Sequence, residues 1–210
     1  MTWTNGAGWN AHEGGNVPAA AGGGDGSFAT WDPTDFEVAD TFGNARIQLT
    51  GPANLIATSF NSSGGFCFTS GNRAFSGQSR FEVTISGVNP GITLAAPKTN
   101  GAGGGLFGGN GGLIWATTGH VFIGFADQGA IAPTYANGDV CGIEVDMTAK
   151  KAYFVVNSGS RLPSTGLDIS GMTGPLYPAA DCGNSNGNIA TARFGPPWTT
   201  TTTAGYGAIP

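Results

Sequence analysis

Short runs in which apolar and polar residues alternate recur along the chain from Trp31 onward. The clearest is Arg80–Ser86, where Phe81, Val83 and Ile85 share one side of an extended strand and polar residues occupy the other. Glycine, proline, asparagine and serine separate these runs, as turns between strands require. We therefore expect strands at Ala45–Thr50, Asn54–Phe60, Phe66–Thr69, Arg80–Ser86, Ile92–Ala95, Leu113–Ala116, Val121–Ala126, Leu176–Asp181 and Ile189–Phe194.

The longest stretch without glycine or proline, Ile143–Ser158, is long enough for a helix. Its pattern indicates strands instead, because apolar residues alternate with Glu144 and Asp146. The polar Thr148–Lys151 and the β-rich run Ala152–Val156 come next, so the stretch predicts a hairpin. About eleven short strands without a long amphipathic helix predict an all-β fold, an antiparallel sandwich or barrel.

The first 30 residues differ from the rest, with eight glycines and six alanines. They cannot bury enough apolar surface to fold alone, so we divide the chain into an N-terminal arm (1–30) and a sandwich domain (31–210). We expect Trp3 and Trp9 to anchor the arm to a neighbouring subunit. The N-terminus lacks the basic start and apolar core of a signal peptide, which predicts synthesis in the cytoplasm without secretion.

Charged residues are few. They make up 10% of the sequence, against roughly 25% in an average globular domain. Such a surface suits a protein largely covered by neighbours, or one whose solubility rests on Asn, Ser and Thr. The net charge of −5 and the lack of a basic cluster beyond Lys150-Lys151 argue against nucleic-acid binding. No apolar run approaches the roughly 18 residues of a membrane span, so no membrane insertion is expected.

Two carboxylates on one predicted strand are the strongest candidates for catalysis. Glu144 and Asp146, at positions i and i+2, project from one face, as the acid and nucleophile of some sandwich-fold glycosidases do. Such enzymes usually carry a further carboxylate on the same strand, and the next same-face position here is Thr148. A pair of Cys67 with His120 has no supporting signature of nucleophilic catalysis. We therefore expect no catalytic residues, and interpret Glu144 and Asp146 as the outward polar face of a half-buried strand.

No metal or cofactor site is expected. Cys67, Cys141 and Cys182 form no CxxC pair, and their odd number argues against a closed disulfide framework, although the pairing of any two stays open. Asp181–Asn188 is rich in oxygen ligands, but a glycine at its third position breaks the order of a calcium loop. Gly103–Gly108 matches a phosphate-binding glycine pattern only formally, because no helix follows it.

Five motifs occur in a fixed order in the second half of the chain. They are Phe81–Ile85 (FEVTI), Gly138–Asp146 (GDVCGIEVD), Tyr153–Asn157 (YFVVN), Gly174–Ala179 (GPLYPA) and Arg193–Gly195 (RFG). Their order and spacing resemble those of the SPRY domain, a concanavalin A-like antiparallel β-sandwich of jelly-roll type. Thr30–Pro33 and Ala204–Tyr206 also resemble the flanks of SPRY-like proteins of bacteria and their phages. The glycine-rich Gly101–Gly112 departs from the family pattern.

The resemblance implies a non-catalytic recognition module that binds through loops at one edge of the sandwich. Those loops vary between members, so no ligand residue carries over, and aromatics or arginines in loops are the better candidate anchors. We therefore predict Trp115, Tyr135 and Arg161 as partner-binding residues, beside Trp3 and Trp9. The competing interpretations are core packing for Trp115 and a solvated turn for Tyr135 and Arg161.

The low charge, the arm and the phage-like flanks favour a structural component of a phage virion, such as a decoration, head-fibre or tail-associated protein. Its partners would be neighbouring capsid or tail subunits, and its location would be the virion, after synthesis in the host cytoplasm. A free module that recognises a peptide or a glycan is the alternative, with a glycosidase on a concanavalin-like fold as a third. A virion protein could also touch a host-surface glycan or peptide with its loops.

Overall fold

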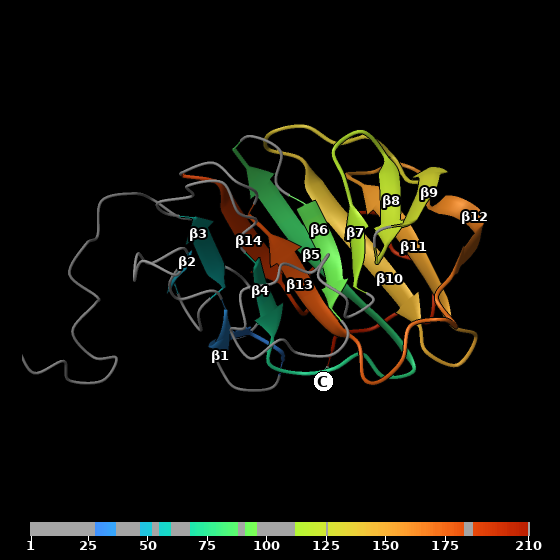
Figure 1. The fold of residues 1–210 in the computed structure, drawn as a ribbon, viewed down its shortest axis with the longest axis horizontal. Helices are drawn as coiled ribbons and strands as arrows, with labels where there is room; N and C mark the ends of the chain where they lie inside the picture. The colour runs from blue at the N-terminus through green and yellow to red at the C-terminus, as the bar shows by residue number, and fades with distance from the viewer. Residues whose placement is uncertain are drawn as a thin grey trace, which may run out of the picture.

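The computed structural model describes residues 28–36, 47–51, 55–59, 68–87, 91–95, 112–124, 126–182 and 187–209. Within these ranges the chain forms fourteen strands in two antiparallel sheets of seven, and it contains no helix that could span a membrane. The sheets stack face to face (Figure 1). The antiparallel β-sandwich predicted from the sequence is confirmed.

The two sheets keep the following spatial orders. Sheet A consists of β1 (Trp31–Phe36), β4 (Phe68–Gly71), β13 (Tyr177–Asp181), β6 (Gly91–Ala95), β7 (Leu113–Trp115), β8 (His120–Ile123) and β9 (Ala126–Ala130). Sheet B consists of β12 (Leu162–Asp168), β11 (Lys151–Val156), β10 (Val140–Asp146), β5 (Gln78–Ser86), β14 (Ile189–Arg193), β3 (Ile56–Ser59) and β2 (Ile47–Thr50).

Three strands have no counterpart among the predicted runs: β1, β9 and β12. Each lies at an edge of its sheet. Their sequences, WDPTDF, ADQGA and LPSTGLD, contain proline, glycine or mostly polar residues. An edge strand pairs on one side only, so it tolerates residues that a central strand does not.

The hairpin predicted within Ile143–Ser158 is confirmed. Strands β10 and β11 pair in register from Cys141 opposite Val156 to Asp146 opposite Lys151. Lys150 closes the turn with a φ of 54°, and the Asp146 carboxylate accepts hydrogen bonds from two backbone N–H groups of the turn. A local side-chain acceptor of this kind replaces the strand ladder where the chain reverses.

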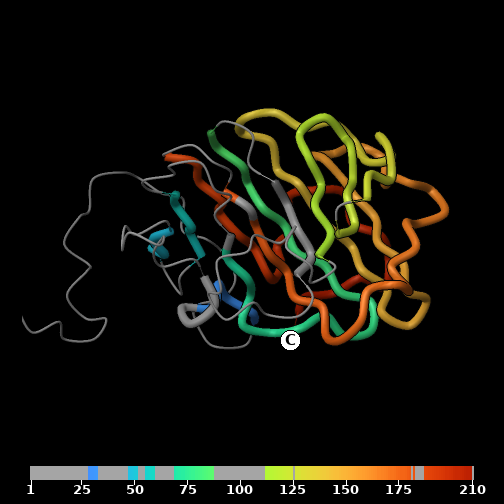
Figure 2. The backbone as a smooth tube through the Cα atoms, viewed as in Figure 1, coloured from blue at the N-terminus to red at the C-terminus, as the bar shows by residue number. Residues whose placement is uncertain are grey.

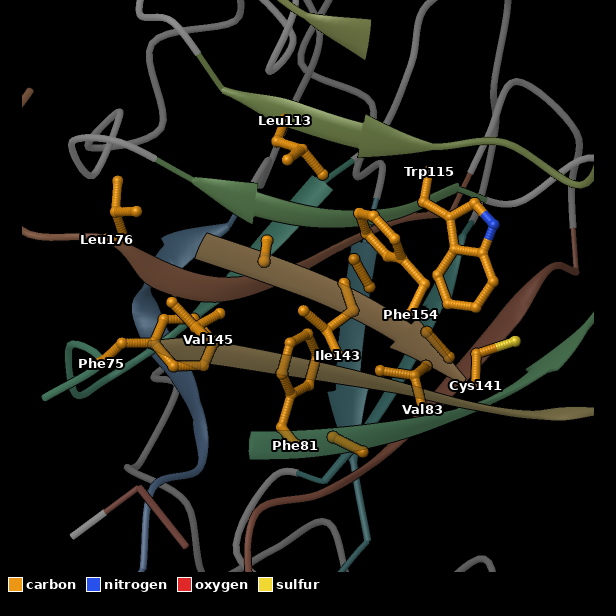
Figure 3. Close-up of a cluster of buried hydrophobic side chains, with 14 of the residues drawn as sticks. Phe75, Phe81, Val83, Leu113, Trp115, Cys141, Ile143, Val145, Phe154 and Leu176 are labelled. Carbon is orange, nitrogen blue, oxygen red and sulfur yellow. The ribbon is translucent and has the colours of Figure 1, made fainter. Parts of the chain in front are cut away.

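Alternate residues of the central strands point inward and form one core (Figure 3). Those labelled in the figure are Phe75, Phe81, Val83, Leu113, Trp115, Cys141, Ile143, Val145, Phe154 and Leu176. Each large apolar side chain buried in this way contributes roughly 1.5–3 kcal/mol. Phe194 extends the core, because its ring stacks on Phe81 and meets the edge of Trp31.

Two of the three cysteines, Cys141 and Cys182, lie in the described part of the chain, and both are fully buried. Burial raises the pKa of the Cys141 thiol, with the nearby charge of Asp139 as a smaller cause. Cys141 therefore behaves as a small apolar core residue. Cys67 lies outside the described residues.

The first described residues already join the sandwich. The backbone N–H of Ala29 donates to the carbonyl of Ile209 at 3.3 Å, and both side chains are fully buried. The predicted anchors Trp3 and Trp9 lie outside the described residues, so the arm and its boundary at residue 30 stay predictions.

Candidate functional site

Three charged side chains lie together on the outer face of sheet B, opposite the core. Arg80 and Glu82 project from β5, and Glu144 projects from β10, where it pairs directly with Arg80. The sequence predicted an outward polar face here. The side chains do point away from the core, but they are buried and not exposed to solvent. All three side chains are at most 1% exposed. Another part of the chain must therefore cover them.

The cover is a C-terminal segment, residues 198–207, which we call the strap. It follows Phe194, crosses the outer face of sheet B, and rejoins the sheet as a parallel bridge between Ser79 and Gly207. Ile209 then returns to the core, as Phe194 does before the strap, so both ends are anchored by fully buried apolar side chains. The C-terminal end of the chain is the dark red tube in Figure 2.

Glu82 binds the first half of the strap through its carboxylate. It accepts hydrogen bonds from the backbone N–H groups of Thr199 and Thr200, at 2.9 and 2.8 Å, and from the Thr200 hydroxyl at 2.8 Å. Arg80 donates to the same carboxylate at 3.0 Å. Bonds to an ionised group are the stronger kind of hydrogen bond, so this contact ties the strap to the sheet.

Glu144 binds the second half. It accepts bonds from Arg80 and from the backbone N–H of Thr203, both at 3.1 Å. Arg80 also donates to the hydroxyl of Thr200, and its guanidinium lies 4.7 Å from the ring centre of Trp198. The two carboxylates and the arginine compensate one another, which a charged group removed from water requires.

Burial lowers the pKa of the Arg80 guanidinium, and the adjacent Glu82 and Glu144 carboxylates oppose that change. An arginine starts from so high a pKa that it stays charged in proteins. The cluster therefore consists of a cation held between two acceptors, and it positions the strap.

The carboxylates that the sequence singled out for catalysis are already engaged in structural contacts. Glu144 is fully buried beneath the strap. Asp146 accepts hydrogen bonds from the backbone of Ala149 and Thr148 and from the Gln78 amide, and these bonds hold the pKa of its carboxyl below the usual range. In this arrangement the pair presents no acid and nucleophile to a sugar ring.

An exposed extension of the cluster contains Arg161, which the sequence predicted as a partner-binding residue. Its side chain is 28% exposed, and one nitrogen lies 3.5 Å from the Glu144 carboxylate. The guanidinium rests 3.8 Å from the ring centre of Tyr153 on β11 and 5.7 Å from that of Tyr206 in the strap. We call Arg161, Tyr153 and Tyr206 the Arg161 frame.

Gly166 lies against the Tyr153 ring of this frame, at a position where a larger residue would clash with it. It sits on β12 with a φ of +76°, and a Cβ at this position would lie 2.7 Å from the Tyr153 ring. Tyr206 packs edge-on against Tyr153 with ring centres 6.3 Å apart. Burial, and next the neighbouring Tyr153, raise the pKa of Tyr206 to about 12. Tyr206 is therefore neutral at physiological pH.

The structure places the other described candidates in the core. Trp115 is fully buried and donates its indole N–H to the carbonyl of Pro133 at 2.9 Å. Tyr135 is 5% exposed, and its hydroxyl donates to the carbonyl of Trp115 at 2.8 Å. Core packing, the competing interpretation for Trp115, agrees with this placement, and neither ring offers a surface to a partner in this conformation.

The two tyrosines of the frame were not predicted from the sequence. Tyr153 carried a usable signal, because it occupies an outward position of a strand whose neighbours Ala152 and Phe154 face the core. Tyr206 carried none, since its place beside Arg161 depends on the path of the strap. An exposed pair on sheet A, in which His120 lies 2.9 Å from the Asp127 carboxylate, was not predicted either.

No group of three or more His, Cys, Asp or Glu side chains among the described residues could hold a metal ion. In the oxygen-rich segment Asp181–Asn188, the Asn188 amide donates to the Cys182 carbonyl and thus serves the local backbone. Residues 183–186 of that segment lie outside the described ranges.

Comparison with known proteins gives one kind of match. No family model and no curated protein matches the chain. Among solved structures, the SPRY domain of human HERC1 is similar with a TM-score of 0.61 and 14% identity, over 78% of this chain and 96% of that one. The TRIM65 PSpry domain follows with 0.53 and 14%, over 79% and 91%.

Stonustoxin is a third similar structure, with a TM-score of 0.52 and 15% identity over 79% of this chain and 27% of that chain. Identities this low establish the fold alone. The fold is a SPRY-type β-sandwich, as the motifs in the sequence predicted.

Proposed function

We propose that this chain is a non-catalytic recognition domain that binds a partner protein through the outer face of sheet B, at the Arg161 frame. The observation that carries the proposal is how the charges on this face are used. Arg80, Glu82 and Glu144 are buried and hold the strap, whereas Arg161 remains at the surface between two tyrosines. Arginine and tyrosine are, with tryptophan, the side chains most enriched where protein interfaces concentrate their binding energy. The SPRY-type fold supports the same assignment.

A crosslinking experiment tests this face. A photoreactive amino acid would replace Ser160, which is exposed and precedes Arg161, or Gln128, which is exposed on the outermost strand of sheet A. In the native assembly, the Ser160 variant should give one discrete adduct and the Gln128 variant none. Adducts from Gln128 alone would place recognition on the other sheet and refute the proposal.

We further propose that the partner is a capsid or tail subunit and that the chain is built into a phage virion, after synthesis in the host cytoplasm. The low charge and the phage-like flanking motifs support this part. Purified particles of the phage that encodes the chain should contain it in a fixed ratio to the major capsid protein, by quantitative mass spectrometry. Its absence from washed particles would end this reading.

A free module that recognises a peptide or glycan is the second candidate. The specific observation in its favour is that the Arg161 frame is complete within one chain, so recognition does not require assembly. Absence from particles together with a discrete Ser160 adduct would favour this candidate over the virion component.

A further inference from the structure

Two half-exposed arginines flank the buried cluster, and they differ in one respect. The Arg161 side chain is 28% exposed and lies 3.5 Å from Glu144, while the Arg193 side chain is 31% exposed and lies 3.5 Å from Glu82. Exposure and distance to the nearest carboxylate therefore nearly match. The two guanidinium groups differ, however, in the number of hydrogen bonds that they make.

Arg193 is occupied by its own chain. Besides Glu82, the same nitrogen donates to the carbonyl of Pro197 at 3.0 Å and to the hydroxyl of Thr199. These contacts hold the residue against the segment that leads into the strap. Arg193 is thus a structural cation.

Arg161 has donors to spare. Among the described residues, its hydrogen bonding consists of the single 3.5 Å contact with Glu144. A guanidinium carries five N–H donors in a planar fork, so about four of them are left without a protein acceptor. The other oxygen of Glu144 accepts from Arg80 and from the Thr203 backbone, and these two bonds fix the position of the carboxylate.

The Arg161 frame also fixes the orientation of this fork. The guanidinium lies against Tyr153 at 3.8 Å and near Tyr206 at 5.7 Å, so contacts with two rings restrain a side chain that is otherwise flexible. A restrained arginine loses less conformational entropy on binding than a free one. The geometry therefore favours a planar ligand that accepts two parallel hydrogen bonds.

The local charge favours a single negative charge. Arg80, Arg161 and Arg193 face Glu82 and Glu144, so among these five groups one positive charge is uncompensated. Three more charges lie on this side of the sheet, and one of them is Asp168, which pairs opposite Lys151. Asp146 is close enough to raise the pKa of Tyr206, and Lys151 pairs opposite it. A dianion such as phosphate would be repelled by Asp146 and Glu144 more than a carboxylate would.

We propose that Arg161 binds a carboxylate of the partner protein, an Asp or Glu side chain, through a two-pronged hydrogen bond between the rings of the frame. This inference rests on the proposed recognition function of the same face and specifies its chemistry. It predicts an acidic residue at the centre of the partner's contact surface.

The test is an NMR titration of the full chain, labelled with ¹⁵N and ¹³C, with the peptide acetyl-Ser-Glu-Ser-amide. Its comparators carry Gln or phosphoserine at the central position. The Glu peptide should shift the Arg161 Nε–H and the ring signals of Tyr153 and Tyr206, with a Kd on the order of 1–10 mM, as expected for two charge-assisted hydrogen bonds of roughly 1.5–2 kcal/mol each. The Gln peptide should give no saturable shift, and the phosphoserine peptide should bind no more tightly than the Glu peptide.

Three variants make the test specific. Arg161→Gln should weaken binding by about tenfold or more, and Arg161→Lys by about three- to tenfold, because lysine keeps the charge and loses the planar fork. Arg193→Gln should stay within about twofold of the wild type, since its guanidinium is held by Glu82, Pro197 and Thr199 and lies outside the Arg161 frame. Unchanged thermal melting of the Arg161 variants would show that they are folded.

Several results would overturn the inference. Equal losses in Arg161→Gln and Arg193→Gln would show a general effect of positive charge. Tighter binding of the phosphoserine peptide would replace the carboxylate with a phosphate, and saturable shifts with the Gln peptide would remove the charge requirement. The Ser160 crosslink is independent of these results: a discrete adduct with a failed titration refutes the carboxylate alone, whereas a missing adduct refutes the recognition function itself.

Discussion

Replacing Glu82 with glutamine tests whether the buried carboxylates hold the strap. The substitution keeps the size of the side chain and removes its charge. The hydrogen bonds to the carboxylate all come from donors, namely Arg80, Arg193, the backbone N–H groups of Thr199 and Thr200, and the Thr200 hydroxyl. One oxygen of the amide can still accept, but its NH₂ group faces the remaining donors.

The expected loss follows from those contacts. Hydrogen bonds to a charged group contribute about 1.5–3 kcal/mol each and neutral ones about 0.5–1.5 kcal/mol. Three bonds to one oxygen, Oε1, come from Arg80, the Thr200 N–H and the Thr200 hydroxyl at 2.8–3.0 Å, and each therefore loses roughly 1 kcal/mol when the amide oxygen replaces it. The total of about 3 kcal/mol agrees with the roughly 3–5 kcal/mol that breaking a buried ion pair costs.

Urea unfolding at pH 7 measures this loss. With a slope of about 2 kcal/mol per molar urea, the midpoint of Glu82→Gln should fall by about 1.5 M. Hydrogen exchange should also show faster exchange at the amides of Thr199 and Thr200, because the strap opens locally before the sheets unfold. Asp168→Asn is the matched control, since Asp168 is exposed and should shift the midpoint far less.

A fall of less than about 0.3 M in Glu82→Gln, or one equal to that of the control, would refute the reasoning. So would unchanged exchange at Thr199 and Thr200. Either result would mean that the apolar anchors at the two ends of the strap hold it without the buried charges.

Three further predictions address the rest of the structure. Gly166→Ala should lose about 1–2 kcal/mol more stability than Gly129→Ala in thermal melts. Both glycines have a positive φ, but only at position 166 would the added Cβ press against Tyr153. Equal losses would contradict this prediction. The raised pKa of Tyr206, about 12 in the folded state against an ordinary 10, contributes stability that is full below pH 10 and is lost as pH rises toward 12. Tyr206→Phe should therefore flatten the fall in stability between pH 10 and 12, and an unchanged slope would count against the assignment. Cys141 should resist thiol reagents in the native protein and react in urea, and rapid native labelling would show that the core opens there.

The central strands could be predicted because apolar residues alternate along their sequence with the same two-residue period as buried side chains along the strand. Phe81, Val83 and Ile85 alternate along the sequence and face the core together, since successive side chains of a strand point to opposite sides. The edge strands β9 and β12 could not be predicted in this way. They bury little, so their sequences carry no such alternation.

The exposure of the polar face could not be predicted, because it depends on distant contacts. Glu82 meets Thr199 across 117 residues of sequence, and a local pattern does not contain that pairing. Arg161 was predicted from its residue type and its place in a loop. The tyrosines that frame it were missed, because the frame unites β11, a loop and the strap.

The aromatic candidates Trp115 and Tyr135 were predicted to be at a binding surface, and the structure places them elsewhere. Trp115 and Tyr135 are large and amphipathic, and such residues serve both cores and binding surfaces. The structure places both in the core, each with its polar atom bonded to a backbone carbonyl. Residue type alone therefore does not separate a buried aromatic from a binding one.

The central claim is that the charged outer face is structural and that the domain is non-catalytic. The most direct test compares the wild type with Glu144→Gln. Both proteins are assayed on a broad polysaccharide panel, and the urea unfolding of both is measured. We predict no turnover by either protein and a loss of stability of about 3 kcal/mol in the variant, because Glu144 is buried against Arg80 and the Thr203 backbone. Glycoside hydrolysis by the wild type that disappears in an equally stable Glu144→Gln would contradict the account.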